Sequence, residues 1–581
     1  MLIVGIARAT REDRTDDRAH TCGRTSRGGG EAPIDAAMSY AARTAMKRAG
    51  HLAWVLAVIV SCRAGPAWAF CSPIDAATTD SQSVARLLQA YRAHRTSVVS
   101  VVRQRLARIE KCNGGEQGLN SVIALNPRAL ADAEAADALL RAGGALPPLF
   151  GVPVLIKGNY NVDGMLNDGG MSGWAQVVRI PPLFEALEVR RLRAAGAIIL
   201  GRGNLDDLAY HGSTTSSLYG QTLNPYSPTP DNSPGGSSGG PAVSLSIGIA
   251  TIANGTDDGG SNRIPAQFSG VVGLKTTYGL VSKWGVIPTF PLFDAHGPLA
   301  RSVGDVARML QVVAGADTDD AATQASPAIA RDYVSYLRTD ALRGKKLGIV
   351  RANLFGADPA SPVGRLFEQA VHDTRAAGAT VVDVDISVAT RDGMYAAYRE
   401  LGGDVDRDYI DVHCAAGVNA MRRYLNASYG PQGDPLFRKL YAIPFVSDIY
   451  HLSGEDLERA LGGQWEDKPE TAQFEGRRRA LVAKLVEAMD QLGLDALIWP
   501  TLPYPSAVIG PLPRPTALKV ANFLGVPELS VPIGRTKDVV GGANLSFLGR
   551  PFDEGKLLAL GFAYEHARKR PGNAPSSASN Q

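Results

Sequence analysis

The stretch from Gly235 to Ser261, GGSSGGPAVSLSIGIATIANGTDDGGS, is the feature that most constrains this chain. Two glycine–serine loops flank a run of small and apolar residues, Ala242 to Ala253. Glycines on both sides of a serine permit positive φ and let a ligand approach the main chain closely. The apolar run between the loops can hold them at a fixed separation in a core. The stretch therefore predicts a site that presents serine hydroxyls together with backbone N–H groups.

Other interpretations of these loops fit less well. GGSSGG alone is typical of a flexible linker or a turn, but a linker needs no apolar, periodic flanks. A phosphate-binding loop needs G-x-x-x-x-G-K-[ST], and the nearest approach, around Gly270 to Thr276, has Leu274 in place of the second glycine. A G-x-S-x-G nucleophile elbow does not account for the serines either.

A second candidate segment lies upstream, where GVPVLIKGNYNVDG predicts a short apolar strand that ends at Lys157. A lysine at a strand end is commonly solvated. The Val, Leu and Ile residues directly before Lys157 favour a desolvated side chain instead. Because desolvation lowers the pKa of a lysine, this residue can be neutral at working pH and act as a base.

Lys157, Ser237 and Ser261, with GGSSGG and GTDDGGSNRIPAQFSGVVGLKTTYG, resemble the amidase signature family of amide hydrolases. Ser261 follows Ser237 by 24 residues, which matches the family pattern. The resemblance runs from roughly residue 83 to residue 568, and its other motifs are GRGNLDDLA, LNPY, HGPLARSVGDVARML and FLGRPFDEGKLLALGFAYEHA.

The resemblance implies a Ser–cis-Ser–Lys triad and an acyl-enzyme mechanism. Ser261 maps to the nucleophile, Ser237 to the bridging serine with a cis peptide before it, and Lys157 to the base. The candidate oxyanion hole consists of the backbone N–H groups of four residues, Asp258, Gly259, Gly260 and Ser261.

Side chains around the two loops are expected to support them. Ser238 and Thr256 are expected to orient the loops by hydrogen bonds. Asp257 and Arg263 are interpreted as partners that brace the second loop, and the alternative is a surface pair.

Several positions depart from the family pattern. Asp258 stands where a small or apolar residue is usual, and Gly158 replaces the common Asp after the lysine. Asn262 and Thr276 replace a usual Ile and a usual Pro. An Asp258 carboxylate pointing at Lys157 would raise the lysine's pKa and weaken the base. We expect the side chain of Asp258 to face away.

A composition of 45% hydrophobic and 20% charged residues is ordinary for a globular enzyme with a large core. Because the family motifs are spread along the chain, the resemblance implies one large α/β domain over residues 70–570. Alternating helix-like and strand-like segments favour a mixed, mostly parallel β-sheet core covered by helices on both sides. A net charge of +3 gives no indication of nucleic-acid binding or of a polybasic membrane contact.

The predicted strands are 120–125, the strand ending at Lys157, 197–201, 345–350, 380–386 and 495–500. The predicted helices are 84–94, 96–112, 127–141, 187–195, 303–314, 363–377 and 477–492. Residues 390–470 are rich in aromatic residues, which either line the acyl pocket, as in similar enzymes, or pack against the core.

The segment 46–69 has the pattern of a secretory signal peptide. A basic start at Met46 precedes a short apolar core, and Ala67-Trp68-Ala69 gives a cleavage site. We expect an exported protein, periplasmic or secreted, with no stable membrane span. The alternatives are lipidation at Cys62, or a buried helix or fortuitous apolar run. Residues 1–45 are interpreted as a non-translated or disordered extension, and residues 571–581 as a disordered tail.

Cleavage after Ala69 would leave Cys71, Cys112 and Cys414. Export permits a disulfide, so a Cys71–Cys112 pair is one hypothesis and free, buried thiols are the other. The cysteines and the nine histidines show no metal-ligand spacing, so we expect neither a metal nor a cofactor.

The function that these observations favour is an exported amidase that cleaves a small-molecule or peptide amide. The second alternative is a glutamine-amidotransferase subunit, which resembles the same family. An export signal argues against this function, because the transfer RNA and the partner subunits of such a protein are cytoplasmic. A non-catalytic binding protein on the same scaffold is a further alternative, which the complete triad disfavours. The sequence leaves the substrate and the oligomeric state open.

Overall fold

The computed structural model describes residues 71–115, 118–227, 231–326, 332–354, 359–450, 458, 469–510, 516–535 and 540–568. The predicted extension (1–45), signal peptide (46–69) and C-terminal tail (571–581) lie outside these residues. Among the described residues, no helix is both long and apolar enough to cross a membrane.

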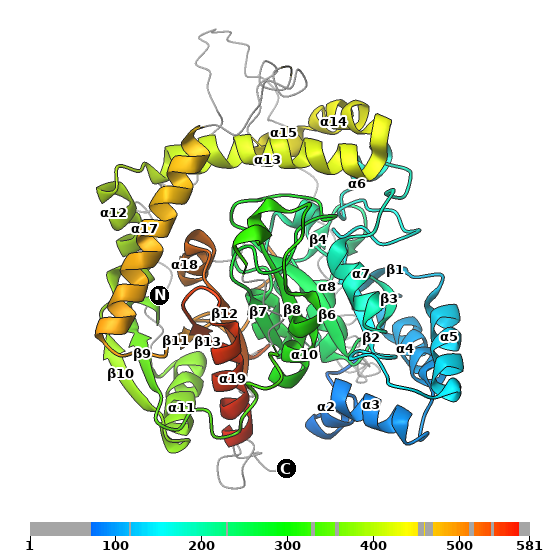
Figure 1. Cartoon of the computed structure of the whole chain (residues 1–581), viewed down its shortest axis with the longest axis horizontal. Coiled ribbons are helices and arrows are strands. Elements are labelled where there is room, and N and C mark those ends of the chain that lie inside the picture. Colours follow the sequence, from blue (N-terminus) through cyan, green and yellow to red (C-terminus); the bar gives the residue numbers. More distant parts are fainter. Residues whose placement is uncertain are drawn as a thin grey trace, which may run out of the picture.

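An 11-stranded sheet runs through the molecule (Figure 1). In spatial order its strands are β1 (Val122–Leu125), β3 (Ile198–Gly203), β2 (Pro153–Lys157), β6 (Ile252–Asp257), β8 (Ala295–Ala300), β7 (Val272–Lys275), β12 (Glu528–Gly534), β13 (Ala543–Leu548), β11 (Ala496–Pro500), β9 (Lys346–Val350) and β10 (Thr380–Val384). A separate two-stranded ribbon joins β4 (Thr215–Ser216) to β5 (Gly220–Gln221).

The sheet is mixed. Strand β2 pairs in parallel with β3 and β6, and β9 pairs in parallel with β10 and β11. The strands between these two groups pair antiparallel, as does β1 with β3. Strands β2, β3 and β6 are buried along their whole length, which explains the apolar run of β2 and the apolar starts of β3 and β6.

Helices surround the sheet. Those of the first half are α2 (Ala76–Ser81), α3 (Val84–Arg92), α4 (Val98–Asn113), α5 (Ala129–Ala142), α6 (Ser172–Val177), α7 (Leu187–Ala194), α8 (Gly239–Ser246), α9 (Arg263–Ser269) and α10 (Val303–Val313). Those of the second half are α11 (Pro362–Ala376), α12 (Arg391–Glu400), α13 (Val405–Tyr429), α14 (Gly433–Tyr441), α15 (Pro444–Tyr450), α17 (Pro469–Gln491), α18 (Thr516–Leu524) and α19 (Glu554–Arg568). Short 3₁₀ turns lie at Asp207–Ala209, Ala321–Ala325, Arg351–Leu354, Ser387–Ala389 and Gly430–Gln432.

The predicted α/β fold, a single large domain with a mixed sheet and covering helices, is confirmed. Serine side chains at the N-caps of four helices accept backbone N–H bonds and so fix where the helices begin; they are Ser83, Ser97, Ser302 and Ser361. The helix predicted at 477–492 begins earlier, at Pro469.

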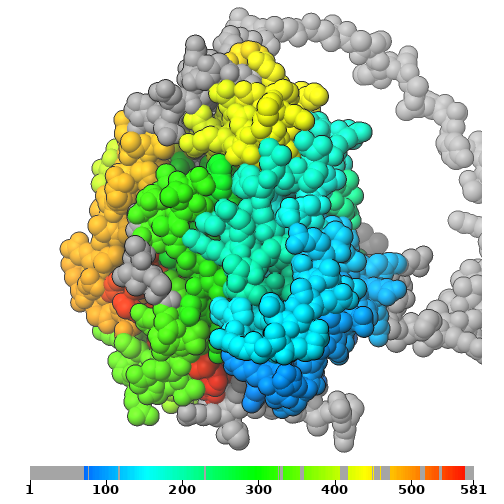
Figure 2. All heavy atoms as spheres, turned by 45° about the vertical axis from the view of Figure 1, so that its right-hand side comes forward, coloured from blue at the N-terminus to red at the C-terminus, as the bar shows by residue number. Residues whose placement is uncertain are grey.

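The long helix α13 spans the top of the view in Figure 1, above the strands, with α14 and α15 beside it. In the space-filling view these helices cover one end of the molecule, next to the segment that holds α6 (Figure 2). Three aromatic residues of this region, Tyr398, Tyr424 and Tyr441, are buried in core clusters, as one of the two interpretations predicts, and Tyr424 also lines a cavity.

Cys71 and Cys112 form a disulfide, with their Cα atoms 5.5 Å apart, which confirms that hypothesis. Because Cys112 lies near the end of α4, the bond ties the segment before α2 to this helix.

Candidate active site

Lys157 ends β2 at the centre of the parallel part of the sheet. Its side chain has no exposed surface. Nζ lies 2.7 Å from Ser237 Oγ and 2.7 Å from Thr256 Oγ1, and donates to both. Thr256 belongs to β6, which neighbours β2, so the sheet itself sets this contact. The expected desolvation of Lys157 is confirmed.

Ser237 lies in the loop before α8, and the Gly236–Ser237 peptide is cis. A side chain at Gly236 would meet Asp206 Oδ2 at 2.4 Å and the backbone N of Ser213 at 2.7 Å. Only glycine fits at this point, which gives the glycines of GGSSGG a steric reason.

Ser261 follows β6 and precedes α9, and it is 6% exposed. The two serine loops meet through the main chain, because the N–H of Ser238 donates to the carbonyl of Ser261 at 3.1 Å. Ser238 Oγ also donates to the carbonyl of Thr256, at 3.4 Å. The fold thus brings the loops of Ser237 and Ser261 together beside Lys157.

Asp257 and Arg263 form a buried ion pair at 2.9 Å, so the predicted bracing pair exists and the surface-pair alternative is wrong. Arg263 also contacts Glu528 of β12 at 2.6 Å. Burial opposes ionisation of Asp257, but the Arg263 guanidinium outweighs it and holds the pKa of this carboxyl well below its usual range.

Not every predicted oxyanion donor points to the site. The N–H of Gly260 donates to the Asp257 carboxylate at 2.7 Å, so this group serves the bracing pair. The N–H groups of Asp258, Gly259 and Ser261 stay as predicted donors. Gly260 has φ of +118°, a conformation that favours glycine.

The expectation that the Asp258 side chain faces away is wrong. Its Oδ1 accepts a hydrogen bond from Ser261 Oγ at 3.4 Å. Burial raises the pKa of Asp258, and the neighbouring Asp294 carboxylate raises it further, while Lys157 lowers it. An ionisable side chain close to the triad therefore replaces the small or apolar residue that is usual here.

Burial lowers the pKa of Lys157 from its usual range, and the carboxylates of Asp258 and Asp294 oppose this shift. A lysine with a lowered pKa is deprotonated over more of the neutral range and can accept a proton.

The other departures have local steric or hydrogen-bonding reasons. A side chain at Gly158 would meet Leu205 Cδ2 at 2.5 Å, so the common aspartate has no room there. Asn262 Nδ2 donates to the carbonyl of Leu274 at 3.2 Å, and Thr276 donates to a carbonyl of β8 at 2.6 Å.

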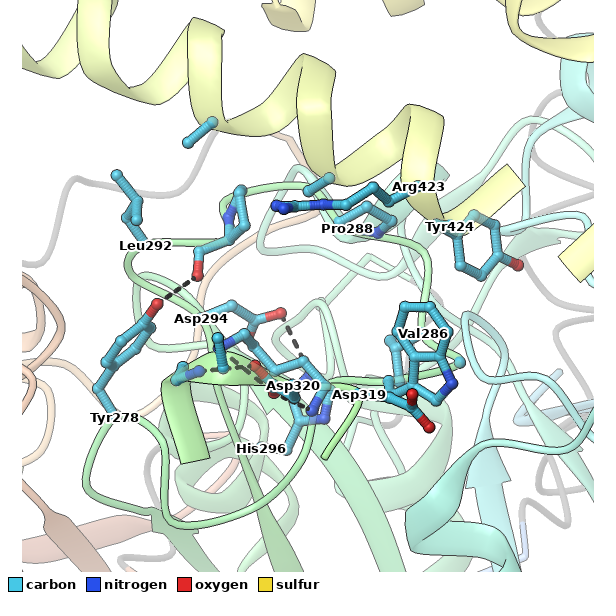
Figure 3. Close-up of a pocket in the computed structure, with 18 of the residues that line it drawn as sticks. Tyr278, Val286, Pro288, Leu292, Asp294, His296, Asp319, Asp320, Arg423 and Tyr424 are labelled. Carbon is cyan, nitrogen blue, oxygen red and sulfur yellow. Dashed lines mark hydrogen bonds and ion pairs between the residues drawn. The ribbon is translucent and has the colours of Figure 1, made fainter. Parts of the chain in front are cut away.

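A cavity of about 570 Å³ lies between α13 and the segment before β8 (Figure 3). Arg423 and Tyr424 of α13 line one side, and Asp294 and His296 line the opposite side. Asp294 connects the cavity to the serine loop, because its Oδ1 accepts the N–H of Asp257 at 3.1 Å.

Several residues that support the site could not be recognised from the sequence. Asn522 of α18 donates to the carbonyl of Asp257 at 2.6 Å, and Asn254 accepts the N–H of Lys157 at 2.9 Å. Glu528 and Asp294 complete the set. They come from distant parts of the chain and carry no local motif. In the described part of the chain, no group of His, Cys, Asp and Glu side chains could hold a metal ion.

Comparison with known proteins shows which family the chain resembles. Residues 100–558 match the family model described as Amidase. The A subunit of glutamyl-tRNA(Gln) amidotransferase from Deinococcus radiodurans is 32% identical over 517 residues, covering 83% of this chain and 97% of that protein. Its counterpart from Methanosarcina acetivorans is 34% identical, covering 78% and 92%.

Solved structures agree. The peptide amidase from Stenotrophomonas maltophilia is 31% identical, with a TM-score of 0.69, and the match covers 84% of this chain and 97% of that one. With a family match over most of its length and relatives of this identity, the chain belongs to the amidase signature family and is a hydrolase of amide C–N bonds.

Proposed function

We propose that the chain is an exported amidase that hydrolyses a carboxylic amide through an acyl-enzyme on Ser261. The observation that carries the proposal is the 2.7 Å contact between the buried Nζ of Lys157 and Ser237 Oγ, beside the loop of Ser261. A buried amine in contact with one serine, next to a second serine, is the arrangement that activates a hydroxyl nucleophile.

In the proposed mechanism, Ser261 Oγ bonds to the amide carbonyl carbon and gives its proton to Ser237. Ser237 passes its own proton to neutral Lys157. The tetrahedral intermediate collapses, the C–N bond breaks, and the relay returns the proton to the leaving amine. Water then hydrolyses the ester to Ser261 by the same path. Backbone N–H groups of the Ser261 loop stabilise the oxyanion.

The cavity beneath α13 is the proposed place for part of the substrate. Its lining combines apolar residues, Val286, Ile287, Pro288 and Leu292, with a few polar groups, which is typical of small-molecule sites. Asp294 links this cavity to the serine loop.

Export is supported by the Cys71–Cys112 disulfide, since such bonds persist in oxidising compartments. The predicted signal peptide at 46–69 ends two residues before Cys71. Fractionation of cells that express the full chain tests this part: recovery of the protein only from the cytoplasm would contradict it.

A second candidate is the A subunit of a glutamyl-tRNA(Gln) amidotransferase, because relatives with that name are similar over more than nine-tenths of their length. Such a protein would need partner subunits and would use glutamine as its ammonia donor. This candidate would be favoured if the isolated chain hydrolysed none of the amides tested and hydrolysed glutamine only in the presence of such partner subunits.

The test is release of amine or ammonia from short aliphatic amides, aryl anilides and peptide amides. The wild type is run beside Lys157→Ala and Ser261→Ala, with melting temperatures to confirm folding. We expect the wild type to hydrolyse at least one class and both variants to lose that activity. A folded wild type that is inert on the whole panel, or a variant with full activity, would overturn the proposal.

A further inference from the structure

We propose that the Asp258 side chain is a pH switch beside the nucleophile: the enzyme is active while this carboxyl is protonated and is switched off when the carboxyl ionises. This inference rests on the proposed amidase function. It adds a titrating group at the nucleophile end of the relay, opposite Lys157.

The geometry places the carboxyl on the reacting atom. Asp258 Oδ1 lies 3.4 Å from Ser261 Oγ, while Lys157 Nζ is engaged with Ser237 and Thr256. Lys157 lowers the pKa of Asp258, but no ion pair of Asp258 is formed among the described residues. The carboxyl is therefore a direct partner of the proposed nucleophile and has no ion pair to hold it ionised.

The charged groups that face Asp258 come from three elements. Lys157 extends from β2, and Asp294 lies in the segment before β8. Asp257, at the end of β6, is already paired with Arg263 of α9. Burial and the Asp294 carboxylate favour the neutral carboxyl, and the Lys157 cation opposes them. In agreement with this, the pKa of Asp258 is raised by burial and by Asp294.

The chemistry requires the same state. When Ser261 Oγ bonds to the carbonyl carbon, a negative charge develops on the adjacent oxygen. A carboxylate next to Oγ would repel that charge at short range in a site of low dielectric. Its negative charge would also hold the proton on Lys157, which must be neutral to accept one. Protonated Asp258 removes both penalties.

The two groups titrate together, so the pH profile belongs to the pair. Below the range of activity Lys157 is charged. Above it Asp258 is ionised. The competent form, with neutral Lys157 and protonated Asp258, therefore predicts a bell-shaped profile whose alkaline limb is present only when Asp258 carries its carboxyl.

The experiment uses the full chain and a fluorophosphonate probe, which needs no known substrate. In the labelling reaction the bond from Ser261 Oγ to phosphorus forms, the P–F bond breaks, fluoride leaves, and the serine proton passes through Ser237 to Lys157. The second-order labelling constant is measured from about pH 6 to about pH 10.5, a range that covers neutral Lys157 and ionised Asp258. Wild type, Asp258→Asn and Asp258→Ala are compared, with Asp340→Asn as a control for loss of an exposed carboxylate.

We expect the wild-type rate to fall at least tenfold from its maximum at high pH, as for ionisation of one group over a further pH unit. Asp258→Asn should lose this limb and reach a plateau at or above the wild-type maximum. Asp258→Ala should behave in the same way, which covers the case in which the asparagine variant does not fold. Asp340→Asn should keep the wild-type profile.

An alkaline limb that stays in both Asp258 variants, or loss of labelling at every pH in folded variants, would overturn the role of Asp258. The amide found in the hydrolysis panel should give the same profiles. A wild type that hydrolyses no amide would instead count against the proposed function, so the two failures are distinguishable.

Discussion

Lys157 is a cationic side chain with no exposed surface, held between two hydroxyl groups. Its burial is what makes it a base, because water no longer stabilises the charged form and the pKa falls. Activity that depends on neutral lysine should therefore rise with pH and be lost as the pH falls through the lysine's pKa. This prediction concerns the acid limb, which is separate from the alkaline limb assigned to Asp258.

Lys157→Arg tests the need for a neutral amine. Arginine keeps the positive charge and cannot be deprotonated at working pH. We expect kcat/KM to fall about 100- to 10,000-fold, the usual contribution of general base catalysis. Raising the pH should restore nothing. Substantial activity that increases at alkaline pH would contradict the role of base.

Thr256→Val tests the second hydrogen bond of the lysine. Valine has nearly the same shape, but it leaves one N–H of Lys157 without its acceptor at 2.7 Å. We expect kcat/KM to fall about tenfold, since a buried hydrogen bond of this kind contributes about 1.4 kcal/mol. The matched control is Thr251→Val, because the buried Thr251 hydroxyl has no hydrogen-bond partner among the described residues. Equal losses in both variants would show a general packing effect.

At the scale of elements, Arg263 joins its own helix to three other elements. It belongs to α9, pairs with Asp257 at the end of β6, and contacts Glu528 of β12. Asn522 of α18 accepts from the same guanidinium at 2.6 Å. The serine loop is thus held by a buried charge network and not by local turn geometry alone.

Arg263→Met should lower the free energy of unfolding by about 3–5 kcal/mol, because it leaves two buried carboxylates without their cation. In the wild type the lowered pKa of Asp257 contributes stability above the carboxyl's unfolded pKa, which is lost as the pH falls through the folded value. In Arg263→Met, burial should raise the pKa of Asp257 above its unfolded value, so this variant should lose stability as the pH rises.

The gap in stability between wild type and Arg263→Met should therefore be smaller at about pH 4.5 than at about pH 8. Urea unfolding at the two pH values measures it. Arg338→Met, which breaks an exposed ion pair with Asp340, is the control and should change stability little at either pH. A penalty that does not depend on pH would contradict the charge argument.

The elements themselves could largely be predicted. Apolar periodicity identified α4 and α10, and an uninterrupted apolar run identified β2, because burial on one or both faces leaves such patterns in a sequence. The motifs identified Lys157, Ser237 and Ser261. The order of the strands could not be predicted, since pairing of β12 with β7 depends on residues 250 positions apart or more. The prediction that the Asp258 side chain faces away was wrong for a related reason. The conformation of its loop depends on contacts with α18 and β12, which are distant in the sequence.

At the scale of the whole molecule, the Cys71–Cys112 bond closes a segment with a sequence separation of 41. Replacing both cysteines by alanine should lower the free energy of unfolding by about 4 kcal/mol, as the unfolded chain regains the freedom that the bond removes. Denaturation with and without a reductant measures the effect. The double variant should not respond to reductant. If reductant lowered the stability of the wild type and of the double variant equally, its effect would not come from the Cys71–Cys112 bond.

The order of the strands in the sheet has a consequence for how the chain folds during synthesis. Strands β12 and β13, which follow the other described strands in the sequence, lie between β7 on one side and β11 on the other. Until they are inserted, the sheet exists as two separate halves, and Arg263 lacks its Glu528 partner. During synthesis the brace of the Ser261 loop therefore stays incomplete until translation has passed these two strands, so their insertion sets the earliest time at which the enzyme can become active.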